Sequence, residues 1–325
     1  MDLTLGAEEW QIVDSAAQFL AGAYPIARLH RAEGQDRADG TALAAMGWFA
    51  IALPERLGGL GMSVVDEALV FREIGRRLGP VSVLPTAIAA EVAARAGTDA
   101  LAGTLIRGEA SAALAVALPG QEGGFMLHGG RDATHAIRIE PDRATLHALQ
   151  GASIDPRPAL DKSIPLGRAR LGQPMIVLED GAPYRRAALA LAAMQSGLAE
   201  AVMAMTVDYA KLRVTFGRPI GAYQAVRHPC ADMALRAEAA RALLLNAAVA
   251  VRDGLEGAAE LVEAARAISH DAAIRNADDS IQLHGGVGIT EEHDAHLFMK
   301  RAQTLGQWLG SKRAVLDRIA AMAVA

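Results

Sequence analysis

Two polar, glycine-containing segments carry the residues whose types and spacing could bind an anionic ligand. Residues 213–221 have the sequence RVTFGRPIG, in which the forked guanidinium of Arg213 and the hydroxyl of Thr215 could hold a phosphate. Residues 282–288 have the sequence QLHGGVG, where glycines without a Cβ would let a ligand approach the backbone closely. Each segment has a simpler alternative: a solvated loop for the first, and a helix end with a glycine turn for the second. Because we expect no strand before the second segment, it is not the dinucleotide motif G-x-G-x-x-G.

The other reactive side chains indicate structure rather than chemistry. Residues 291–296 (EEHDAH) hold His293 and His296, whose spacing could place both on one helical face, but the helices of metalloproteases need histidines four residues apart. We therefore expect a helix start with acids near its positive end, and no metal. His284, at a helix end, is expected to be a structural hydrogen-bonding group. Cys230 is the one cysteine, which excludes an internal disulfide and a Cys-rich zinc site and predicts a small buried apolar residue.

Composition predicts a globular, mostly helical protein. Of the 325 residues, 52% are hydrophobic and 21% are charged, which allows a sizeable core and two or three domains. The formal charge of −5 argues against nucleic acid or an anionic membrane as the main partner. The N-terminus lacks a basic and apolar leader, and no uncharged stretch reaches the ~20 apolar residues of a membrane span. We therefore expect a cytoplasmic protein, rich in alanine, the best helix former, and poor in strand-favouring aromatics.

The elements that must position the polar segments fall into three zones, which predict three domains. Residues 1–112 are expected to form a helical domain, residues 113–182 a small β domain, and residues 183–325 a set of four long helices. In the first zone, one helix is expected to begin after Ser63 with Asp66 near its start, and to end at Gly79 before a proline. The other helices expected there include residues 41–50, 86–96 and 99–107.

Glycine and proline separate short runs of strand length in the middle zone. These runs predict a small antiparallel sheet or barrel, with strands at residues 113–118, 125–128, 134–140, 144–149 and 175–178. The last zone predicts helices at residues 187–209, 224–253, 258–284 and 294–321. The segment with Arg213 then connects the first two of these helices, and the glycine-rich segment connects the last two.

Three segments in this order resemble signatures of the flavin-dependent acyl-CoA dehydrogenases. Residues 213–225 resemble R-x-x-F-G-x-x-I-x-x-x-Q, residues 282–290 resemble Q-x-x-G-G-x-G, and residues 53–61 (LPERLGGLG) resemble P-E-x-x-G-G-x-G. The resemblance spans residues 5–322. It implies a helical N-terminal domain, a central β-barrel and a C-terminal four-helix bundle. It also implies FAD as the cofactor, an acyl-CoA substrate, assembly as a dimer of dimers, and an electron-transfer flavoprotein or a similar acceptor as a partner.

The family chemistry that the resemblance implies needs a base that this chain lacks. Family members remove two hydrogens from an acyl-CoA: a Glu takes the α-proton and FAD accepts the β-hydride. In most members this Glu lies near the C-terminus, where the matching residue here is Leu309. Other members place it before an Arg early in the first bundle helix, where this chain has Arg185 and Arg186. The strand that contacts the flavin ring in the family corresponds to residues 117–119 (ALP), without the family's hydroxyl and acid, and we find no counterpart of its W-[IV]-T strand.

The residues that are kept resemble the groups that hold FAD, largely its ADP half, across a subunit interface. By this resemblance Arg213 and Thr215 would bind the pyrophosphate, and the other predicted cofactor-binding residues are Phe216, Gln224, Gln282, Gly285 and Gly286. A chain with this half alone resembles the short, degenerate subunit of the heteromeric α₂β₂ members, which often act on bulky or steroid-derived CoA esters. We therefore expect a larger acyl-CoA dehydrogenase subunit as its partner.

Two alternatives stay open at this point. The chain could be a self-sufficient homomeric enzyme that uses an unassigned base such as Glu200 or Glu238. It could also be a scaffold of the same fold that has lost the flavin.

Overall fold

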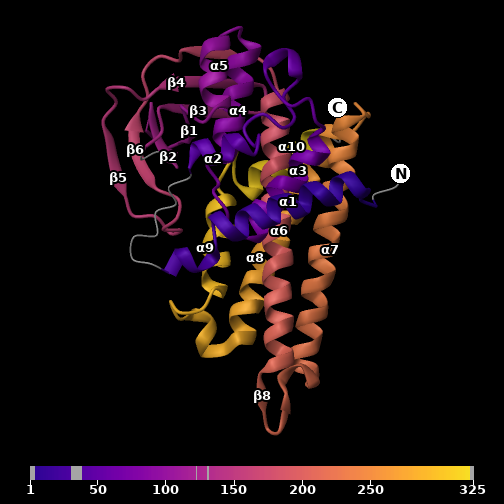
Figure 1. Cartoon of the computed structure of the whole chain (residues 1–325). Helices are drawn as coiled ribbons and strands as arrows, with labels where there is room; N and C mark the ends of the chain where they lie inside the picture. Colours follow the sequence, from indigo (N-terminus) through magenta and orange to yellow (C-terminus); the bar gives the residue numbers. More distant parts are fainter. Residues whose placement is uncertain (1–3, 31–38, 122, 130–131, 323–325) are drawn as a thin grey trace. The chain divides into compact units, whose positions relative to one another are not determined.

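The structure is a computed structural model that describes residues 4–30, 39–121, 123–129 and 132–322 (Figure 1). Its contacts divide the chain into two compact units, each assembled from segments that are distant in sequence. We call residues 1–32, 68–79 and 191–325 the bundle unit, and residues 33–67 and 80–190 the sheet unit. Helices dominate and the strands gather in one main sheet, which confirms the expected fold class. The sequence-based division into three domains stays a prediction.

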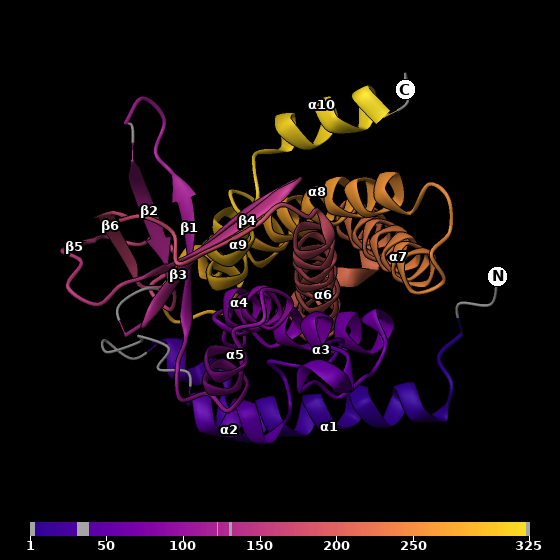
Figure 2. The ribbon, with the colours of Figure 1, turned by 90° about the horizontal axis from the view of Figure 1, so that it is seen from above.

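The sheet unit is built on a seven-stranded sheet with the order β5-β6-β2-β1-β3-β4-β7, which Figure 2 shows from above. Its strands are β1 (Ala112–Ala117), β2 (Gly124–His128), β3 (His135–Glu140), β4 (Arg143–Ala148), β5 (Ile154–Arg157), β6 (Leu166–Arg170) and β7 (Ile176–Leu178). The expected antiparallel pairing is wrong at one place, because β1 and β3 pair in parallel. The strands β5 and β6 were missed by the sequence analysis, since the sequences IDPR and LGRAR show little of the apolar alternation that marks a strand.

The helical segments of the sheet unit include one, α4 (Val83–Arg95), that packs on this sheet. The sheet unit also holds α2 (Gly40–Ala45), the short 3₁₀ segment η2 (Glu55–Leu57) and α5 (Asp99–Ile106). All residues of α4 from Val83 to Ala94 are buried, and α4 contacts β1, β3, β4 and β7 as well as α5. The hydroxyl of Thr86 in α4 accepts a hydrogen bond from the backbone N–H of Ala112 in β1, which joins the helix to the sheet. The helix expected over residues 41–50 is shorter than predicted, because Gly47 has a left-handed φ of 72°.

The helix α3 (Val64–Arg76) is capped as expected at its N-terminus, but its C-terminal end differs from the prediction. The Ser63 hydroxyl accepts from the backbone N–H of Asp66, and the Asp66 carboxylate accepts from both the backbone N–H and the hydroxyl of Ser63. At the other end the left-handed residue is Leu78, with a φ of 49°, rather than Gly79. Gly79 is small for a different reason, since a Cβ there would lie 2.9 Å from the Leu20 side chain.

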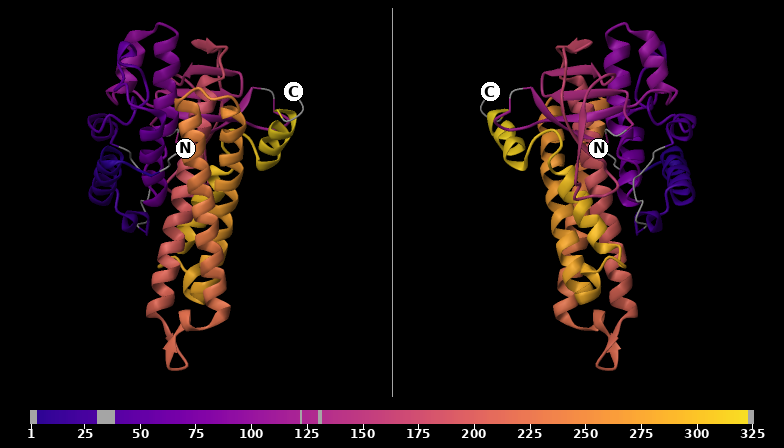
Figure 3. Two further views of the ribbon diagram at one scale, coloured as in Figure 1. Left: turned by 90° about the vertical axis from the view of Figure 1, so that its right-hand side faces the viewer. Right: turned by 90° about the vertical axis from the view of Figure 1, so that its left-hand side faces the viewer.

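The bundle unit consists of long helices, seen from two sides in Figure 3. Its elements are α1 (Ala7–Ala23), the 3₁₀ segment η1 (Ile26–His30), the later part of α3, α6 (Ala182–Leu212) from Leu191 onward, β8 (Val214–Thr215), β9 (Arg218–Pro219), η3 (Ile220–Ala222), α7 (Gln224–Arg252), α8 (Ala258–His284), η4 (Gly285–Ile289), α9 (Ala295–Leu305) and α10 (Lys312–Met322). The bounds of α8 match the prediction, and those of α7 differ by one residue.

The last predicted helix, over residues 294–321, is wrong because two helices occupy this stretch. The chain turns between α9 and α10, where Leu309 and Gly310 have left-handed φ values of 56° and 102°. Gly306 lies against α8, so that a Cβ there would be 2.4 Å from the His270 ring. The Arg266 guanidinium binds the carbonyls of Trp308 and Leu309 at 3.1 and 3.4 Å, which replaces hydrogen bonds that a continuous helix would make.

The helix α6 has the length and hydropathy of a membrane span, with a mean hydropathy of 1.4 over its most apolar window. However, 72% of that window is buried inside the structure, as in the core helix of a bundle. No other helix in the described ranges meets the same criteria.

Helices α3 and α6 approach closely through a pair of glycines in the bundle unit. A Cβ on Gly75 would lie 2.0 Å from the carbonyl oxygen of Met194, and a Cβ on Gly197 would lie 2.0 Å from that of Arg72. Because backbone atoms cannot move aside as a flexible side chain can, each glycine is required by the crossing.

Replacing Gly75 with alanine is therefore expected to lower the free energy of unfolding by about 1–3 kcal/mol through overpacking. Gly22, near the end of α1, is the matched control, because a Cβ there would meet nothing within 4 Å. Gly22→Ala should be neutral or stabilise the protein by up to about 1 kcal/mol. Denaturant unfolding of both variants measures the difference, and equal effects would contradict this account of the crossing.

Candidate cofactor-binding site

A two-residue hairpin forms the tip that connects α6 to α7. Strands β8 and β9 pair on either side of Phe216 and Gly217, whose left-handed φ values of 51° and 80° match the turn of a tight hairpin. A left-handed φ is strained for phenylalanine, and the Phe216 ring is 92% exposed, so packing within this chain does not offset the strain. Such an arrangement is typical of a side chain placed for contact with something outside the chain.

The hairpin is held by its backbone and by Tyr223, which leaves one guanidinium available. The hydroxyl of Tyr223 donates to the carbonyl of Thr215 at 3.1 Å, and the Arg218 guanidinium lies over the Tyr223 ring at 4.1 Å. The backbone of Arg213 is bonded to Tyr209 and Ile220. Its exposed guanidinium makes no hydrogen bond or ion pair with any residue that the structure describes, so it could bind an anion without first breaking an internal contact.

The glycine-rich segment begins at the end of α8, and one of its glycines has no explanation within this chain. Gly285 caps the helix with a positive φ of 64°, but its ψ of −144° differs from the αL cap that the simpler alternative predicts. Gly286 has no left-handed φ, and a Cβ there would meet nothing within 4 Å. The backbone of Gly286 is exposed, as is Gln282 one turn earlier, so a ligand or another chain could approach this segment.

The two segments lie at the same end of the bundle unit. Tyr209, in the last turn of α6, stacks on His284, the last residue of α8, with ring centroids 4.3 Å apart. The seven predicted cofactor residues are exposed there, apart from Thr215, which is half-buried. We call this surface the bundle tip, and it also exposes a set of large apolar side chains, namely Leu212, Val214, Phe216, Val287 and Ile289. Exposed apolar side chains gathered around a free guanidinium are typical of a surface that another molecule covers.

The two positions where family members carry their base hold no acid. Leu309 lies in the turn before α10, where the buried Arg266 binds its carbonyl and also reaches Glu263 at 3.4 Å. The small cavity beside this turn has a volume of about 10 Å³, barely the space that one water molecule needs. In the sheet unit, Arg186 is buried between Glu67 and Glu91, with N–O distances as short as 2.5 and 3.1 Å.

Glu200 and Glu238, the alternative bases, are both hydrogen-bonded to arginines. Glu200 accepts hydrogen bonds from Arg72 at 2.8 and 2.6 Å and from Arg76 at 3.0 Å. Glu238 accepts from Arg241 at 3.0 and 2.6 Å, and this hydrogen bond lowers the pKa of Glu238. Glu238 is therefore a weak base, because the Arg241 guanidinium stabilises its ionised form.

The structure corrects several expectations about the histidines and the cysteine. His293 precedes α9 instead of sharing a helical face with His296, and its Nδ1 accepts from the backbone N–H of Ala295 at 3.1 Å. Asp294 begins α9, but its carboxylate binds His30 rather than capping the helix. His284 donates to the Ser280 carbonyl, as the structural interpretation predicts. Cys230 is half-buried rather than buried, and this burial raises the pKa of its thiol.

Three polar clusters were missed by the sequence analysis, because their members are far apart in sequence. One joins Arg186 to Glu67 and Glu91, and another joins Arg72 and Arg76 to Glu200. The third joins His30 to Asp294 and the backbone of Glu291, across 264 and 261 residues. For the clusters around Arg186 and Glu200, the only sequence signal was weak: charged residues that recur at helical spacing on otherwise apolar helices. In the described part of the chain, no three or more His, Cys, Asp or Glu side chains are grouped so that they could hold a metal ion.

Comparison with known proteins defines the class to which this fold and site belong. A family model described as "Acyl-CoA dehydrogenase, N-terminal domain" matches residues 6–112, and one described as "Acyl-CoA dehydrogenase, C-terminal domain" matches residues 184–324. The chain therefore belongs to the acyl-CoA dehydrogenase family, whose members are oxidoreductases.

Two curated relatives from Mycobacterium tuberculosis share more than a third of the aligned residues. The acyl-CoA dehydrogenase IpdE2 is 38% identical over 277 residues, which cover 84% of this chain and 82% of IpdE2. The acyl-CoA dehydrogenase FadE34 is 36% identical over 301 residues, which cover 86% of this chain but 41% of FadE34. The chain thus spans less than half of FadE34.

Solved structures of similar fold cover the whole chain. The "Tcur3481-Tcur3483 steroid ACAD G363A variant" has a TM-score of 0.80 at 25% identity and covers 99% of each chain. The ChsE4–ChsE5 complex from Mycobacterium tuberculosis has a TM-score of 0.83 at 23% identity and covers 100% of this chain and 99% of the other. The FAD complex of PigA has a TM-score of 0.85 at 21% identity and covers 99% of each chain. The last two show the fold alone.

Proposed function

We propose that this chain is the subunit of a heteromeric, FAD-dependent acyl-CoA dehydrogenase that lends cofactor contacts to a larger partner and supplies no catalytic base. The observation that carries the proposal is the bundle tip. There Arg213 has no hydrogen-bond or ion-pair partner among the residues that the structure describes, and Phe216 is exposed in a strained turn, while both family base positions lack an acid. An exposed binding surface with no base beside it fits a subunit that contributes cofactor contacts to a partner better than it fits a self-sufficient active site.

The donor set of the bundle tip fits the polar half of FAD. The Arg213 guanidinium and the Thr215 hydroxyl are suited to a pyrophosphate, since a guanidinium can bind two phosphate oxygens at once. The open backbone of Gly285 and Gly286 would let the ADP portion approach, with Gln282 able to donate through its side-chain amide. Phe216 and Gln224, exposed beside them, would pack on or bond to the same ligand.

The proposed reaction is α,β-dehydrogenation of an acyl-CoA thioester. FAD, when bound, supplies the hydride acceptor, and the proton at the α-carbon needs a carboxylate base. This chain would bind and orient the cofactor, whereas the base would come from the partner subunit. The electrons would leave to an electron-transfer flavoprotein or a similar acceptor.

The length of FadE34 supports a larger family member as the partner. The region that matches this chain covers 41% of FadE34, so ~430 residues lie outside it, which is room for several domains of ordinary size. FadE34 could therefore hold in one chain both a region like this protein and a region like its proposed larger partner. Two similar structures also carry the names of two proteins each, ChsE4–ChsE5 and Tcur3481–Tcur3483.

We infer a bulky, steroid-derived CoA ester as the substrate class. The Tcur3481–Tcur3483 protein is described as a steroid ACAD, and this chain shares 25% of its residues over nearly its full length.

Absorbance and mass measurements test the proposal directly. We expect the chain purified alone to be colourless, and the chain co-expressed with a larger acyl-CoA dehydrogenase subunit that binds it to form a yellow heterotetramer with about half a flavin per subunit. Visible absorbance and light scattering measure both quantities. A yellow homotetramer with one flavin per chain would contradict the proposal and restore the self-sufficient alternative. A heterotetramer without flavin would support the scaffold alternative.

A further inference from the structure

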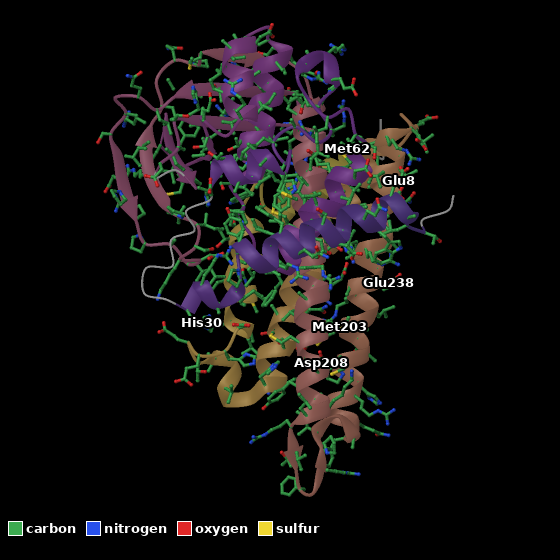
Figure 4. All side chains as sticks on the ribbon, viewed as in Figure 1. Glu8, His30, Met62, Met203, Asp208 and Glu238 are labelled. Carbon is green, nitrogen blue, oxygen red and sulfur yellow. The ribbon has the colours of Figure 1, made fainter. Side chains whose placement is uncertain are left out.

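Four histidines surround the glycine-rich segment at the bundle tip, and each contacts a part of the chain that fixes it. His284 ends α8, His293 precedes α9 and His296 lies in its first turn. His30 comes from η1, more than 250 residues earlier, and reaches the same segment (Figure 4). The stretch from Gly285 to Asp294 between these anchors is exposed for most of its length.

The contacts of His30 require its ring to be protonated at both nitrogens. Nδ1 lies 2.7 Å from the carbonyl oxygen of Glu291, and Nε2 lies 2.6 Å from a carboxylate oxygen of Asp294. A carbonyl oxygen and an ionised carboxylate only accept hydrogen bonds, so both ring nitrogens must donate. His30 is thus an imidazolium that ties η1 to both the loop and the start of α9. A neutral ring would lose one of the two bonds.

The other three histidines require the opposite state. His293 accepts the Ala295 N–H at Nδ1, which therefore carries no proton. His284 donates from Nδ1 to Ser280, and its ring centroid lies 4.3 Å from that of His293. Its Nε2 is buried and has no hydrogen-bond partner among the described residues. Both ring nitrogens of His296 are buried, and the Glu291 backbone lies beside the ring. Charging any of these rings would remove a hydrogen bond or bury an uncompensated charge.

From this geometry we infer that His30 is a positioning residue, a charged clasp that fixes the Gly285–Asp294 segment while the three neighbouring histidines stay neutral. The clasp itself stands on the contacts above. Its consequence for FAD rests on the proposed function, which assigns Gly285 and Gly286 to the cofactor. The segment would then be ordered best within a narrow range of pH, and cofactor retention would follow it.

The surrounding charges agree with this assignment. The hydrogen bond to Asp294 raises the pKa of His30 against its burial, whereas burial lowers the pKa of both His284 and His296. Lys300 of α9 and the carboxylate of Glu291 act on His296 in opposite directions.

Among the described neighbours, the charge of His30 itself also lowers the pKa of His296. On η1 the Arg28 guanidinium is bound to the carbonyls of Tyr24 and Leu78. On α6 the uncharged Tyr209 ring covers His284.

The sign of each pH effect follows from these directions. His30 stabilises the segment fully below its ordinary pKa of about 6.5, and this contribution is lost as the pH rises through its raised pKa. His284 and His296 contribute fully above about 6.5, and their contribution falls as the pH drops through their lowered pKa values. Protection of the segment should therefore be greatest near pH 6.5 and should fall on both sides.

Backbone hydrogen exchange of the flavin-free full chain, corrected for intrinsic rates, measures the clasp without any turnover. We expect exchange of peptides covering residues 285–295 to rise on the order of tenfold from pH 6.5 to pH 9, as one charge-assisted bond is lost. His30→Gln and Asp294→Asn should each be fast already at pH 6.5 and should lose this rise, and the double variant should add nothing further. Glu292→Gln, which removes an exposed carboxylate of the same segment, is the control and should behave as the wild type.

The outcomes separate the clasp from the proposed function. An unchanged pH profile in His30→Gln, or a His30 NMR titration that Asp294→Asn does not lower, would overturn the clasp. Flavin retention by the complex with the partner, measured over the same pH range, is the second readout. Hydrogen exchange could change with pH as predicted while flavin retention does not. The clasp would then stand, and the assignment of Gly285 and Gly286 to the cofactor would be wrong.

Discussion

Replacing Arg186 with methionine is expected to lower the free energy of unfolding of the sheet unit by about 3–5 kcal/mol at neutral pH. Arg186 is buried beside Glu67 and Glu91, which are also buried, and it donates to both carboxylates. Burial opposes the charge of the guanidinium, but the two carboxylates outweigh it and raise the pKa of Arg186. Without the guanidinium, two carboxylates would lie close together in the core, with Arg95 on Glu91 as the partial compensation.

The pH dependence of this effect distinguishes lost charge pairing from lost packing. The variant should have carboxyl groups with raised pKa values, so its deficit should be full at neutral pH and should shrink as acidification protonates them. Denaturant unfolding at pH 7 and pH 5 measures this. Arg313→Met is the control, because Arg313 is 85% exposed, and its pair with Asp317 should contribute no more than about 1 kcal/mol. A deficit that does not change with pH would indicate packing alone.

Replacing Arg213 with alanine is expected to weaken FAD binding by the heteromeric complex about 10- to 100-fold. This magnitude follows from the loss of one charge-assisted contact, worth roughly 1.5–3 kcal/mol, to a pyrophosphate. Because the exposed guanidinium makes no hydrogen bond or ion pair with a described residue, the variant should fold normally, so the effect should be confined to the cofactor. Flavin fluorescence on dilution of the purified complex measures the dissociation constant.

Two further variants show whether the shape of the guanidinium or its charge matters. Arg213→Lys keeps the charge but loses the planar fork, so we expect an intermediate loss. Lys211→Ala removes a cation two residues away that is paired with Asp208, and it should leave flavin binding nearly unchanged. Unchanged occupancy in Arg213→Ala would remove this residue from the proposed site.

The sequence determined the class of the fold and the family, because these depend on local patterns. The bounds of α8 were predicted without error, since its apolar repeat runs to a glycine that can adopt a left-handed φ. The capping of α3 by Ser63 and Asp66 was also predicted, because both partners lie within one turn. The family signatures were visible for the same reason, as each is a run of neighbouring residues.

The tertiary structure decided the features that depend on residues distant in sequence. The parallel pairing of β1 with β3 and the break between α9 and α10 follow from contacts with other elements, such as Arg266 on the carbonyl of Trp308. His30 illustrates the same limit at the candidate site, because nothing near it in sequence indicates a bond to Asp294. Local sequence sets φ, ψ and the apolar face of each element. Which charged groups meet in the folded chain is set by packing, and that packing alone decides which histidine of this site carries a proton.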